Sequence, residues 1–308
     1  MFKYTLDNKR YYTLNYYNQM KYGSKVMKIS LNAGFTCPNI DGTKGTGGCI
    51  FCLGGSNKNH EKDLVKQFYE VKDIMEKKWP DAKYIGYFQA NTNTYAPLKE
   101  LKEKYESILA LPNVVGLNIA TRPDSISDEV LDYLEELSHR TNLVIELGLQ
   151  TINDNTAKII NRRSTLKEFD DCLDRLNKRN IDVVVHIING LPYETKEDMI
   201  NTVKYLSNKK ILGMKIHMLH ILKGTKLYEL YEKEHFHILT KEEYVDIVCE
   251  QLEYLREDIV INRITGDPDV EDLIEPNWLV KKFGVLNEID KEMVKRDIYQ
   301  GDKYKRMD

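Results

Sequence analysis

The sequence lacks any apolar run that could cross a membrane, and its first residues do not resemble a signal peptide. A membrane helix needs about 20 consecutive apolar residues, and a signal peptide needs a basic start followed by a shorter apolar stretch. The opening residues, Met-Phe-Lys-Tyr-Thr-Leu-Asp, contain neither. We therefore expect a cytoplasmic protein without a membrane partner.

Strong net charge and abundant cysteine are lacking too. A formal net charge of −3 over 308 residues gives no sign of a nucleic-acid partner for the chain as a whole. In a chain without a secretory signal, clustered cysteines are more often metal ligands or reactive groups than disulfide partners. Cys172 and Cys249 lie apart from the rest inside helical patterns, where we expect buried structural residues.

Apolar, β-rich runs alternate with amphipathic helical patterns along most of the chain. The predicted strands are Val26–Asn32, Tyr84–Phe88, Val115–Ala120, Leu143–Leu149, Val183–Ile188 and Met214–Leu219. The predicted helices are Lys62–Trp79, Leu98–Leu109, Asp128–Ser138, Asp154–Asn161, Leu166–Lys178 and Lys196–Ser207. Six strand-then-helix units in series indicate parallel strands with right-handed crossovers, in a doubly wound sheet or in a partial barrel.

The first strand decides between these two folds. A Rossmann sheet needs a Gly-x-Gly-x-x-Gly turn after it, but a cysteine-rich loop stands there instead, on the side where parallel barrels collect their chemistry. We predict an α/β fold, a partial (β/α)6 TIM-type barrel over residues 26–225. An N-terminal extension covers residues 1–25. A mostly helical C-terminal extension over residues 226–308 packs on the barrel, because no flexible linker precedes it. Within it we expect a helix at Glu242–Arg256, a strand at Ile259–Ile264 and a helix near Asp290–Tyr299.

Three cysteines stand close together: eleven residues separate Cys37 from Cys49, and two separate Cys49 from Cys52. Three thiolates can hold three irons of a [4Fe-4S] cluster and leave the fourth iron open to a small molecule. A tetrahedral zinc with His60 as the fourth ligand is the alternative. Four intervening glycines favour a larger group, since their backbone can wrap closely around it, and Phe51 has no obvious role beside zinc. On spacing alone, both metals stay open.

The string from Ala33 to Cys52, AGFTCPNIDGTKGTGGCIFC, resembles the radical S-adenosylmethionine (SAM) superfamily, and within it the Elongator-like bacterial subgroup. Most members have three residues between the first two cysteines, whereas this subgroup has a longer loop. The resemblance covers residues 28–225. It implies that Cys37, Cys49 and Cys52 ligate three irons and that SAM chelates the fourth through its amine and carboxylate. It also implies an electron donor such as flavodoxin or ferredoxin, and a 5′-deoxyadenosyl radical that takes a hydrogen atom from an unreactive C–H bond.

The resemblance further suggests SAM contacts at the other strand ends. Family members often carry Gly-Gly-Glu after the second strand, where this chain has Gln89 and its neighbour Asn91. In related oxygen-independent coproporphyrinogen oxidases, a Gln at the fourth strand's end and an Arg twelve residues later hold the ribose and the carboxylate. Gln150 and Arg162 have that spacing. The full set of expected cofactor contacts is Phe51, Gln89, Asn91, Thr121, Arg122, Glu146, Gln150, Arg162, Gly190, Leu191 and His220.

Three residues are candidates for a catalytic role. His186 replaces the first Gly of the family's Gly-x-Ile-x-Gly element on the fifth strand, with a satisfied core histidine as the alternative interpretation. Tyr95 and Tyr193, beside the second and fifth strand ends, are candidates to quench the product radical. Strand alternation lets only one of His217 and His220 face the lumen, and we favour His220 because it lies nearer the mouth.

The resemblance implies a tRNA substrate, because the bacterial Elongator-related subgroup is associated with wobble uridine. The reaction would convert a 5-carboxymethylaminomethyl group to 5-aminomethyl on a base flipped into the barrel mouth. Residues 1–28 carry six basic residues and six tyrosines against one acid, which suits RNA binding. The alternative is that the tyrosines cover a barrel end. A small metabolite or a peptide is the alternative substrate, and a zinc-bound, non-enzymatic protein is the alternative class. The sequence leaves the oligomeric state open.

Overall fold

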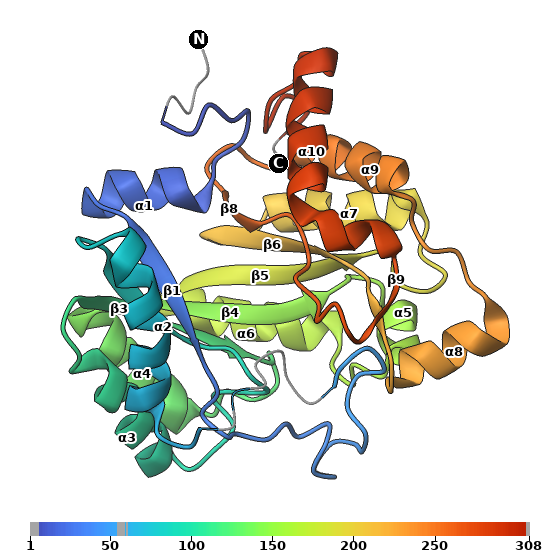
Figure 1. Cartoon of the computed structure of the whole chain (residues 1–308). Helices are drawn as coiled ribbons and strands as arrows, with labels where there is room; N and C mark the ends of the chain where they lie inside the picture. The colour runs from blue at the N-terminus through green and yellow to red at the C-terminus, as the bar shows by residue number, and fades with distance from the viewer. Residues whose placement is uncertain (1–5, 54–58, 60, 306–308) are drawn as a thin grey trace.

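The computed structural model describes residues 6–53, 59 and 61–305. Parallel strands form its main sheet in the spatial order β1-β2-β3-β4-β5-β6-β8. The sheet curls into a half-barrel of the partial TIM type, as predicted (Figure 1). Its strands are β1 (Val26–Leu31), β2 (Lys83–Phe88), β3 (Val114–Thr121), β4 (Asn142–Gln150), β5 (Asp182–Asn189), β6 (Gly213–Met218) and β8 (Val260–Arg263).

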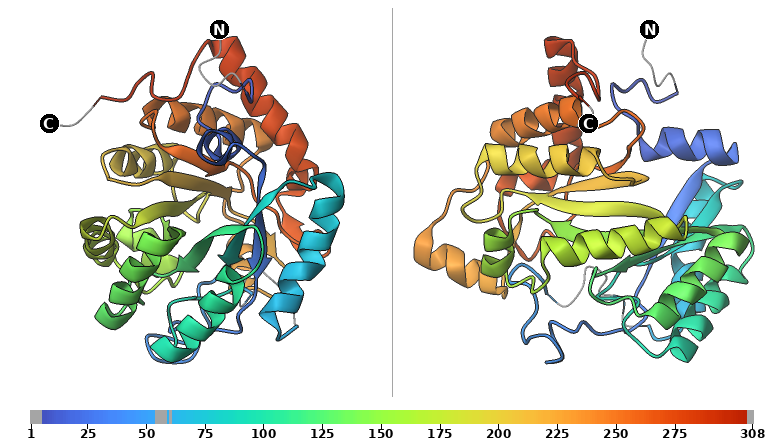
Figure 2. Two further views of the ribbon diagram at one scale, coloured as in Figure 1. Left: turned by 90° about the vertical axis from the view of Figure 1, so that its left-hand side faces the viewer. Right: turned by 180° about the vertical axis from the view of Figure 1, so that it is seen from behind.

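Helices cover the outer face of the curled sheet (Figure 2, left). They are α2 (Leu64–Lys78), α3 (Leu98–Leu109), α4 (Asp128–Arg140), α5 (Asp154–Ile159), α6 (Leu166–Lys178) and α7 (Lys196–Ser207). The apolar core lies between these helices and the sheet, where strand residues such as Ile29, Leu117 and Ile216 are fully buried. Alternation along each strand therefore turns the intervening residues toward the lumen, the concave inner face of the half-barrel.

Local sequence sets where several helices begin. Thr165 and Glu168 form a reciprocal capping box at the start of α6, and Thr195 and Asp198 form another at the start of α7. Each box pairs two backbone N–H groups that a helix start would otherwise leave without a partner. The capping signals thus fix the βα loops on one end of the barrel, where the candidate site residues lie.

The sheet has one strand more than the predicted six. The predicted strand at Ile259–Ile264 pairs parallel with β6 as β8, after a crossover through α8 (Lys226–Glu234) and α9 (Lys241–Tyr254). The C-terminal extension therefore completes the sheet as well as packing on it. The remaining elements of this extension are a short antiparallel pair, β7 (Ile221–Leu222) with β9 (Leu273–Glu275), the 3-10 helix η1 (Asn277–Lys281) and α10 (Lys282–Arg296).

The N-terminal extension closes the floor, which is the end of the half-barrel where the strands begin. Its helix α1 (Leu14–Tyr22) was not predicted, and it crosses that end beside β1 and β8 (Figure 1). Lys21 bonds Asn142 at the start of β4, and Lys83 at the start of β2 donates to the Tyr22 carbonyl at 3.1 Å. The described part of the extension is thus a cover for the barrel floor, which was the alternative to an RNA-binding arm.

The two chain extensions also hold each other. The side chain of Gln300 donates to the carbonyls of Arg256 and Ile259 at 2.9 and 2.8 Å, and it accepts from the Tyr12 N–H at 2.8 Å. Arg10 stacks over the Tyr299 ring, 4.4 Å from its centroid. We call this contact between the two extensions the clasp.

Within the described residues, no helix combines the length and the apolar character that a membrane crossing requires.

Candidate active site

The cysteine loop, residues 33–53, lies at the mouth, the end of the half-barrel where the strands finish (Figure 1). It follows β1 directly and is held by the loops after β2 and around α5. Asn91 donates to the Phe35 carbonyl at 2.9 Å, and the Ile50 N–H donates to the Ile160 carbonyl at 3.0 Å. The loop is thus fixed by main-chain contacts to neighbouring βα loops rather than by a helix or strand of its own.

All three cysteines of this loop are free thiols, and they influence one another electrostatically. Burial raises the pKa of Cys49 to about 12; Cys52 and Cys37 add to the shift, while the positive charge of Arg122 opposes it. Asn39 lies 3.8 Å from the Cys49 sulfur and donates to the Asn161 carbonyl at 2.6 Å. A partly buried group of thiols beside a cation is a donor set for a metal that binds thiolates.

The arrangement bears on which metal the loop would hold. In the described part of the chain, no three His, Cys, Asp or Glu side chains converge as ligands of a single ion. A [4Fe-4S] cluster gives each thiolate an iron of its own, so it does not need the three sulfurs to meet at one point. His60, the predicted fourth zinc ligand, lies outside the described residues.

Next to the loop, the lumen is open because its walls carry small residues. Ser30 on β1, Ala120 on β3 and Gly148 on β4 are all partly exposed, although fully buried apolar residues flank them in the strands. Opposite them, His186 on β5 and His217 on β6 are also partly exposed, with ring centroids 5.5 Å apart. Small side chains on three strands leave room that a filled TIM-type barrel would not have.

Below this space, six strands each contribute one polar side chain to a single connected group, which we call the polar layer. Its centre is Glu146, whose side chain is completely buried. It binds Lys28 at 2.9 Å, Asn118 at 2.6 Å and His186 at 2.8 Å, and it also binds Lys215. Tyr87 completes the layer by accepting from Lys215 at 3.0 Å.

Electrostatics fix the protonation of the polar layer. Burial alone would raise the pKa of Glu146, but Lys215, Lys28 and the bond from His186 outweigh it and hold this pKa well below its usual range. Burial, with the repulsion of Lys215, lowers the pKa of His186 to about 4, and burial also lowers the pKa of His217. Burial lowers the pKa of Lys215 to about 8, so at neutral pH this lysine is still mainly protonated beside the Glu146 carboxylate and the neutral histidines. His186 donates from Nε2 to Glu146, which leaves Nδ1 as an acceptor.

Two residues at the mouth keep hydrogen-bonding atoms available. Gln150 stands at a β-bulge at the end of β4 with a left-handed φ of 62°, and among the described residues nothing pairs with its side-chain amide. The Oδ1 atom of Asn91 is buried without a partner, next to the start of the cysteine loop. An unpaired amide and a buried unpaired acceptor fit the hydroxyl and ammonium groups that SAM would present there.

Other predicted SAM contacts are already occupied within the protein. The guanidinium of Arg162 is buried and donates to the carbonyls of Ser164, Leu149 and Thr151. It therefore stabilises the βα loop rather than being free to bind the carboxylate of SAM. Both oxygens of Glu146 are engaged in the polar layer. Thr121 is buried and bonds Thr94 at 2.5 Å. Spacing along the chain could not reveal these partners: those of Glu146 and Thr121 come from other strands and loops, and those of Arg162 depend on how its own βα loop folds back.

Arg122 and Gln89 lie at the mouth beside the cysteine loop. Arg122 forms a two-pronged pair with Asp124, at 2.9 and 2.7 Å, and remains close enough to Cys49 and Cys37 for its charge to act on both. Gln89 extends the lumen-facing parity of β2, and its N–H donates to the Leu31 carbonyl at 3.2 Å. Their contacts with SAM stay predictions.

The remaining candidates at the strand ends are two tyrosines and two histidines. Tyr95 bonds Thr43 of the cysteine loop at 2.7 Å, while Tyr193 is 57% exposed with a left-handed φ of 66° and bonds Glu234. Strand alternation predicted that only one of His217 and His220 faces the lumen, and we favoured His220. In the structure His217 faces His186, while His220 lies past the end of β6 against Gly266.

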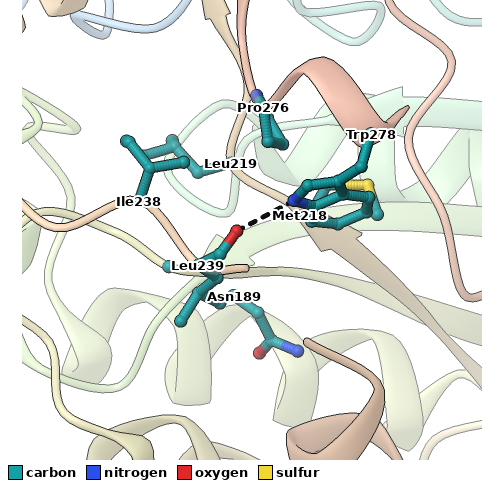
Figure 3. A pocket seen from close by; sticks show the side chains of 8 residues that line it. Asn189, Met218, Leu219, Ile238, Leu239, Pro276 and Trp278 are labelled. Carbon is teal, nitrogen blue, oxygen red and sulfur yellow. Dashed lines mark hydrogen bonds between the residues drawn. The ribbon is translucent and has the colours of Figure 1, made fainter. Parts of the chain in front are cut away.

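The predicted adenine-binding element after β5 faces the C-terminal extension. Gly190, with φ of 84°, lines a small pocket in which Trp278 donates to the Leu239 carbonyl at 3.0 Å (Figure 3). Leu191 is buried in an apolar cluster that also receives Phe51. These side chains support the wall of the mouth, and their contact with SAM stays a prediction.

Sequence reasoning missed most of the polar layer: Lys28, Tyr87, Asn118 and Lys215. A signal was present, since Lys28 and Lys215 interrupt otherwise apolar strands, Val-Met-Lys-Ile-Ser-Leu and Gly-Met-Lys-Ile-His-Met. A lysine inside a buried parallel strand needs a counter-charge, but only the register of the six strands shows that Glu146 supplies it.

Comparison with known proteins agrees with this geometry. The family described as the radical SAM superfamily matches residues 40–206, and its C-terminal domain matches residues 211–295. The chain is 47% identical to Bacillus subtilis YtqA over 100% of this chain and 97% of that protein. It is 28% identical to Elongator complex protein 3 of Schizosaccharomyces pombe, over 44% of this chain and 25% of that protein. The solved structure of Methanocaldococcus infernus Elp3 shares the fold, with a TM-score of 0.68 at 16% identity over 90% of this chain and 64% of that one.

Proposed function

The chain belongs to the radical SAM superfamily and to its Elongator-like subgroup, and from this premise we propose that it modifies the wobble uridine of tRNA. Its cofactors are a [4Fe-4S] cluster and SAM. The observation that carries the proposal is a cysteine loop of the Elongator-like type, set at the mouth of an open lumen. Together the two cofactors supply the one-electron chemistry that activates a C–H bond. The reaction proposed is conversion of 5-carboxymethylaminomethyluridine to 5-aminomethyluridine. The carboxymethyl carbon would be oxidised by two electrons to an imine, with SAM consumed as methionine and 5′-deoxyadenosine, and water would hydrolyse the imine and release glyoxylate.

Residues at the mouth would bind the two cofactors, and residues of the lumen would leave room for the substrate. Cys37, Cys49 and Cys52 would hold the cluster, and Gln150 and the Asn91 oxygen are free to orient SAM. The small residues of β1, β3 and β4 leave a space into which an extruded base can enter.

Exposed cations around the cysteine loop support an RNA partner. The Arg163 side chain lies against Gly45, and the Lys226 ammonium lies against Gly47. Neither side chain makes an ion pair within the described residues, so both charges are available to phosphates. The basic and aromatic N-terminal extension sits at the floor, so we propose that RNA docks on the mouth instead.

Nucleoside analysis tests the reaction directly. Deletion of the gene should raise 5-carboxymethylaminomethyluridine and deplete 5-aminomethyluridine in bulk tRNA, as measured by mass spectrometry. Unchanged levels of both nucleosides would contradict the proposed substrate.

A salt series tests the docking surface. Replacing Arg163 and Lys226 together by Gln should weaken tRNA binding and reduce the slope of log Kd against log salt by about one per lost phosphate contact. Lys21→Gln on the floor is the matched control and should leave both quantities unchanged. If the floor variant alone weakens binding, RNA docks on the N-terminal extension.

A further inference from the structure

The polar layer carries one more positive charge than it can neutralise. Lys28 and Lys215 face a single carboxylate, Glu146. Burial keeps the pKa of His186 and of His217 below neutrality, so neither ring adds charge. Arg263 lies nearby, but Asp267 neutralises it at 3.2 Å. An excess charge away from bulk water is costly unless an anion accompanies it.

The two ammonium groups also keep unused donors. Lys28 makes one hydrogen bond, to Glu146, and Lys215 makes two, to Glu146 and Tyr87. Each ammonium has three N–H groups. Glu146 already receives four donors, so it cannot satisfy the remainder. Both ammonium groups also lie over the Tyr87 ring, 5.5 and 4.4 Å from its centroid, and N–H groups remain for a further acceptor.

The mouth side offers an approach to the layer. There the next lumen-facing residues on β1, β3 and β4 are the small Ser30, Ala120 and Gly148, while β2, β5 and β6 carry the larger Gln89, Ile188 and His217. The side chains of Lys28 and His186 are 17% and 20% exposed. On the floor side, Leu14, Tyr17 and Asn18 of α1 cover a small pocket that Lys28 and Asn118 line from above. The open side faces the same space as the cysteine loop.

We propose that Lys28 and Lys215 bind the carboxylate of the substrate's side chain, in competition with Glu146, which neutralises only one of their two charges. This rests on the proposed function, in which the group removed from uridine carries a terminal carboxylate. The product, an aminomethyl group, lacks that carboxylate. The polar layer would then hold the substrate and release the product, because charge-assisted hydrogen bonds form only with the former.

Binding to short RNA hairpins tests the assignment without turnover. The reconstituted holoenzyme with SAM and no reductant is titrated with anticodon hairpins that carry 5-carboxymethylaminomethyluridine or its methyl ester. The acid should bind roughly tenfold more tightly than the ester, as expected for one charge-assisted hydrogen bond. Lys28→Met and Lys215→Met should each bring this ratio close to one. Lys167→Met, a lysine on the exposed face of α6, is the matched control.

Glu146→Gln separates ligand binding from a structural role. Removing the competing carboxylate frees both lysines, so the acid-to-ester ratio should rise above that of the wild type. Loss of a structural group would lower the ratio or leave it unchanged, and either result overturns the proposal. If a methionine variant fails to fold, Lys28→Arg keeps the charge and should retain the preference for the acid.

Binding of a small carboxylate tests the lysine site without tRNA. N-methylglycine should raise the melting temperature of the holoenzyme more than N-methylglycinamide does, and Lys28→Met should abolish the difference. If neither hairpin binds but this difference persists, the carboxylate site stands and the proposed tRNA substrate falls. If the two probes act alike, or if saturating SAM removes the difference because its own carboxylate occupies the site, the assignment is wrong.

Discussion

The two ends of the half-barrel differ in how their polar groups are arranged. The mouth contains left-handed, non-glycine residues that line the βα loops: Asn91, Gln150, Asn161, Arg163 and Tyr193 have φ between 54° and 66°. The floor is covered by a regular helix, α1, and by a clasp in which each polar atom of Gln300 has a partner. Left-handed residues also precede strands at the floor, Asn113 before β3 and Asn180 before β5, so backbone conformation does not separate the two ends. The polar groups differ: Gln300 in the clasp is fully paired, whereas among the described residues the Oδ1 atom of Asn91 at the mouth has no partner. The comparison assigns chemistry to the mouth and stability to the floor.

The largest effect is expected from Cys52→Ala at the mouth. The variant should lose the cluster and, with it, all reductive cleavage of SAM above background, because two remaining thiolates cannot hold three irons. Its melting temperature should change little, since Cys52 is only partly buried. Iron content and 5′-deoxyadenosine production measure the loss. If the variant keeps both its iron and its 5′-deoxyadenosine production, Cys52 does not hold the cluster, and the assignment of the chemistry to the mouth is wrong.

Gln300→Ala at the floor should lower the stability of the protein and leave its iron content unchanged. Truncation leaves the carbonyls of Arg256 and Ile259 and the Tyr12 N–H without their partner. Each buried unpaired group costs about 1–3 kcal/mol, so the unfolding free energy should fall by about 3–5 kcal/mol. Urea denaturation measures this loss, while iron content per folded protein should equal that of the wild type. Loss of iron at unchanged stability would mean that the floor acts on the cluster.

A smaller, pH-dependent effect is expected from Glu194 beside the mouth. Burial raises its pKa from 4.5 to about 7, although the Thr151 hydroxyl donates to it at 2.5 Å. Because the folded pKa is the higher one, the stability from this group is present below about pH 4.5 and is lost as the pH rises through 7. The loss should amount to at most about 3 kcal/mol. Glu194→Gln should flatten this part of the stability profile, as followed by urea denaturation between pH 5 and about pH 8. A profile identical to that of the wild type would mean that Glu194 ionises freely in the folded protein.

The smallest effect is expected from Tyr95→Phe. The change removes one hydrogen bond, to Thr43 of the cysteine loop, which is worth about 0.5–1.5 kcal/mol. SAM affinity and 5′-deoxyadenosine yield should stay within about threefold of the wild type if Tyr95 only braces the loop. Complete loss of turnover with normal SAM binding would instead show that the phenol takes part in the reaction. Thr43→Val removes the same bond while keeping the phenol, so it serves as the control.

The sequence predicted the fold well because its signals are local. Apolar runs and amphipathic patterns placed six of the parallel strands and the helices between them, and only the seventh strand, β8, was assigned to the extension. The helix α1 was missed because its tyrosines and lysines do not form an apolar stripe. Its buried side chain is that of Asn18, so the pattern gave no warning.

The sequence predicted some residues of the candidate site correctly and others not. The cysteine spacing was informative because all three residues lie in one loop, and the position of that loop after β1 followed from the order of elements. Arg162 matched a known spacing, yet its guanidinium is bound by carbonyls of its own βα loop, which folds back on it. A linear pattern states which residue types occur, but it cannot state which of them already have partners.

By itself, the sequence determined the order of strands and helices, the cysteine loop and the family, because these depend on residues that are neighbours along the chain. Tertiary structure alone decided that α1 closes the floor, that His217 rather than His220 faces the lumen, and that Glu146 gathers two lysines from β1 and β6. These three results depend on strand register and on barrel curvature, which bring Glu146 together with lysines 118 and 69 positions away. Electrostatic contacts act across space rather than along the chain.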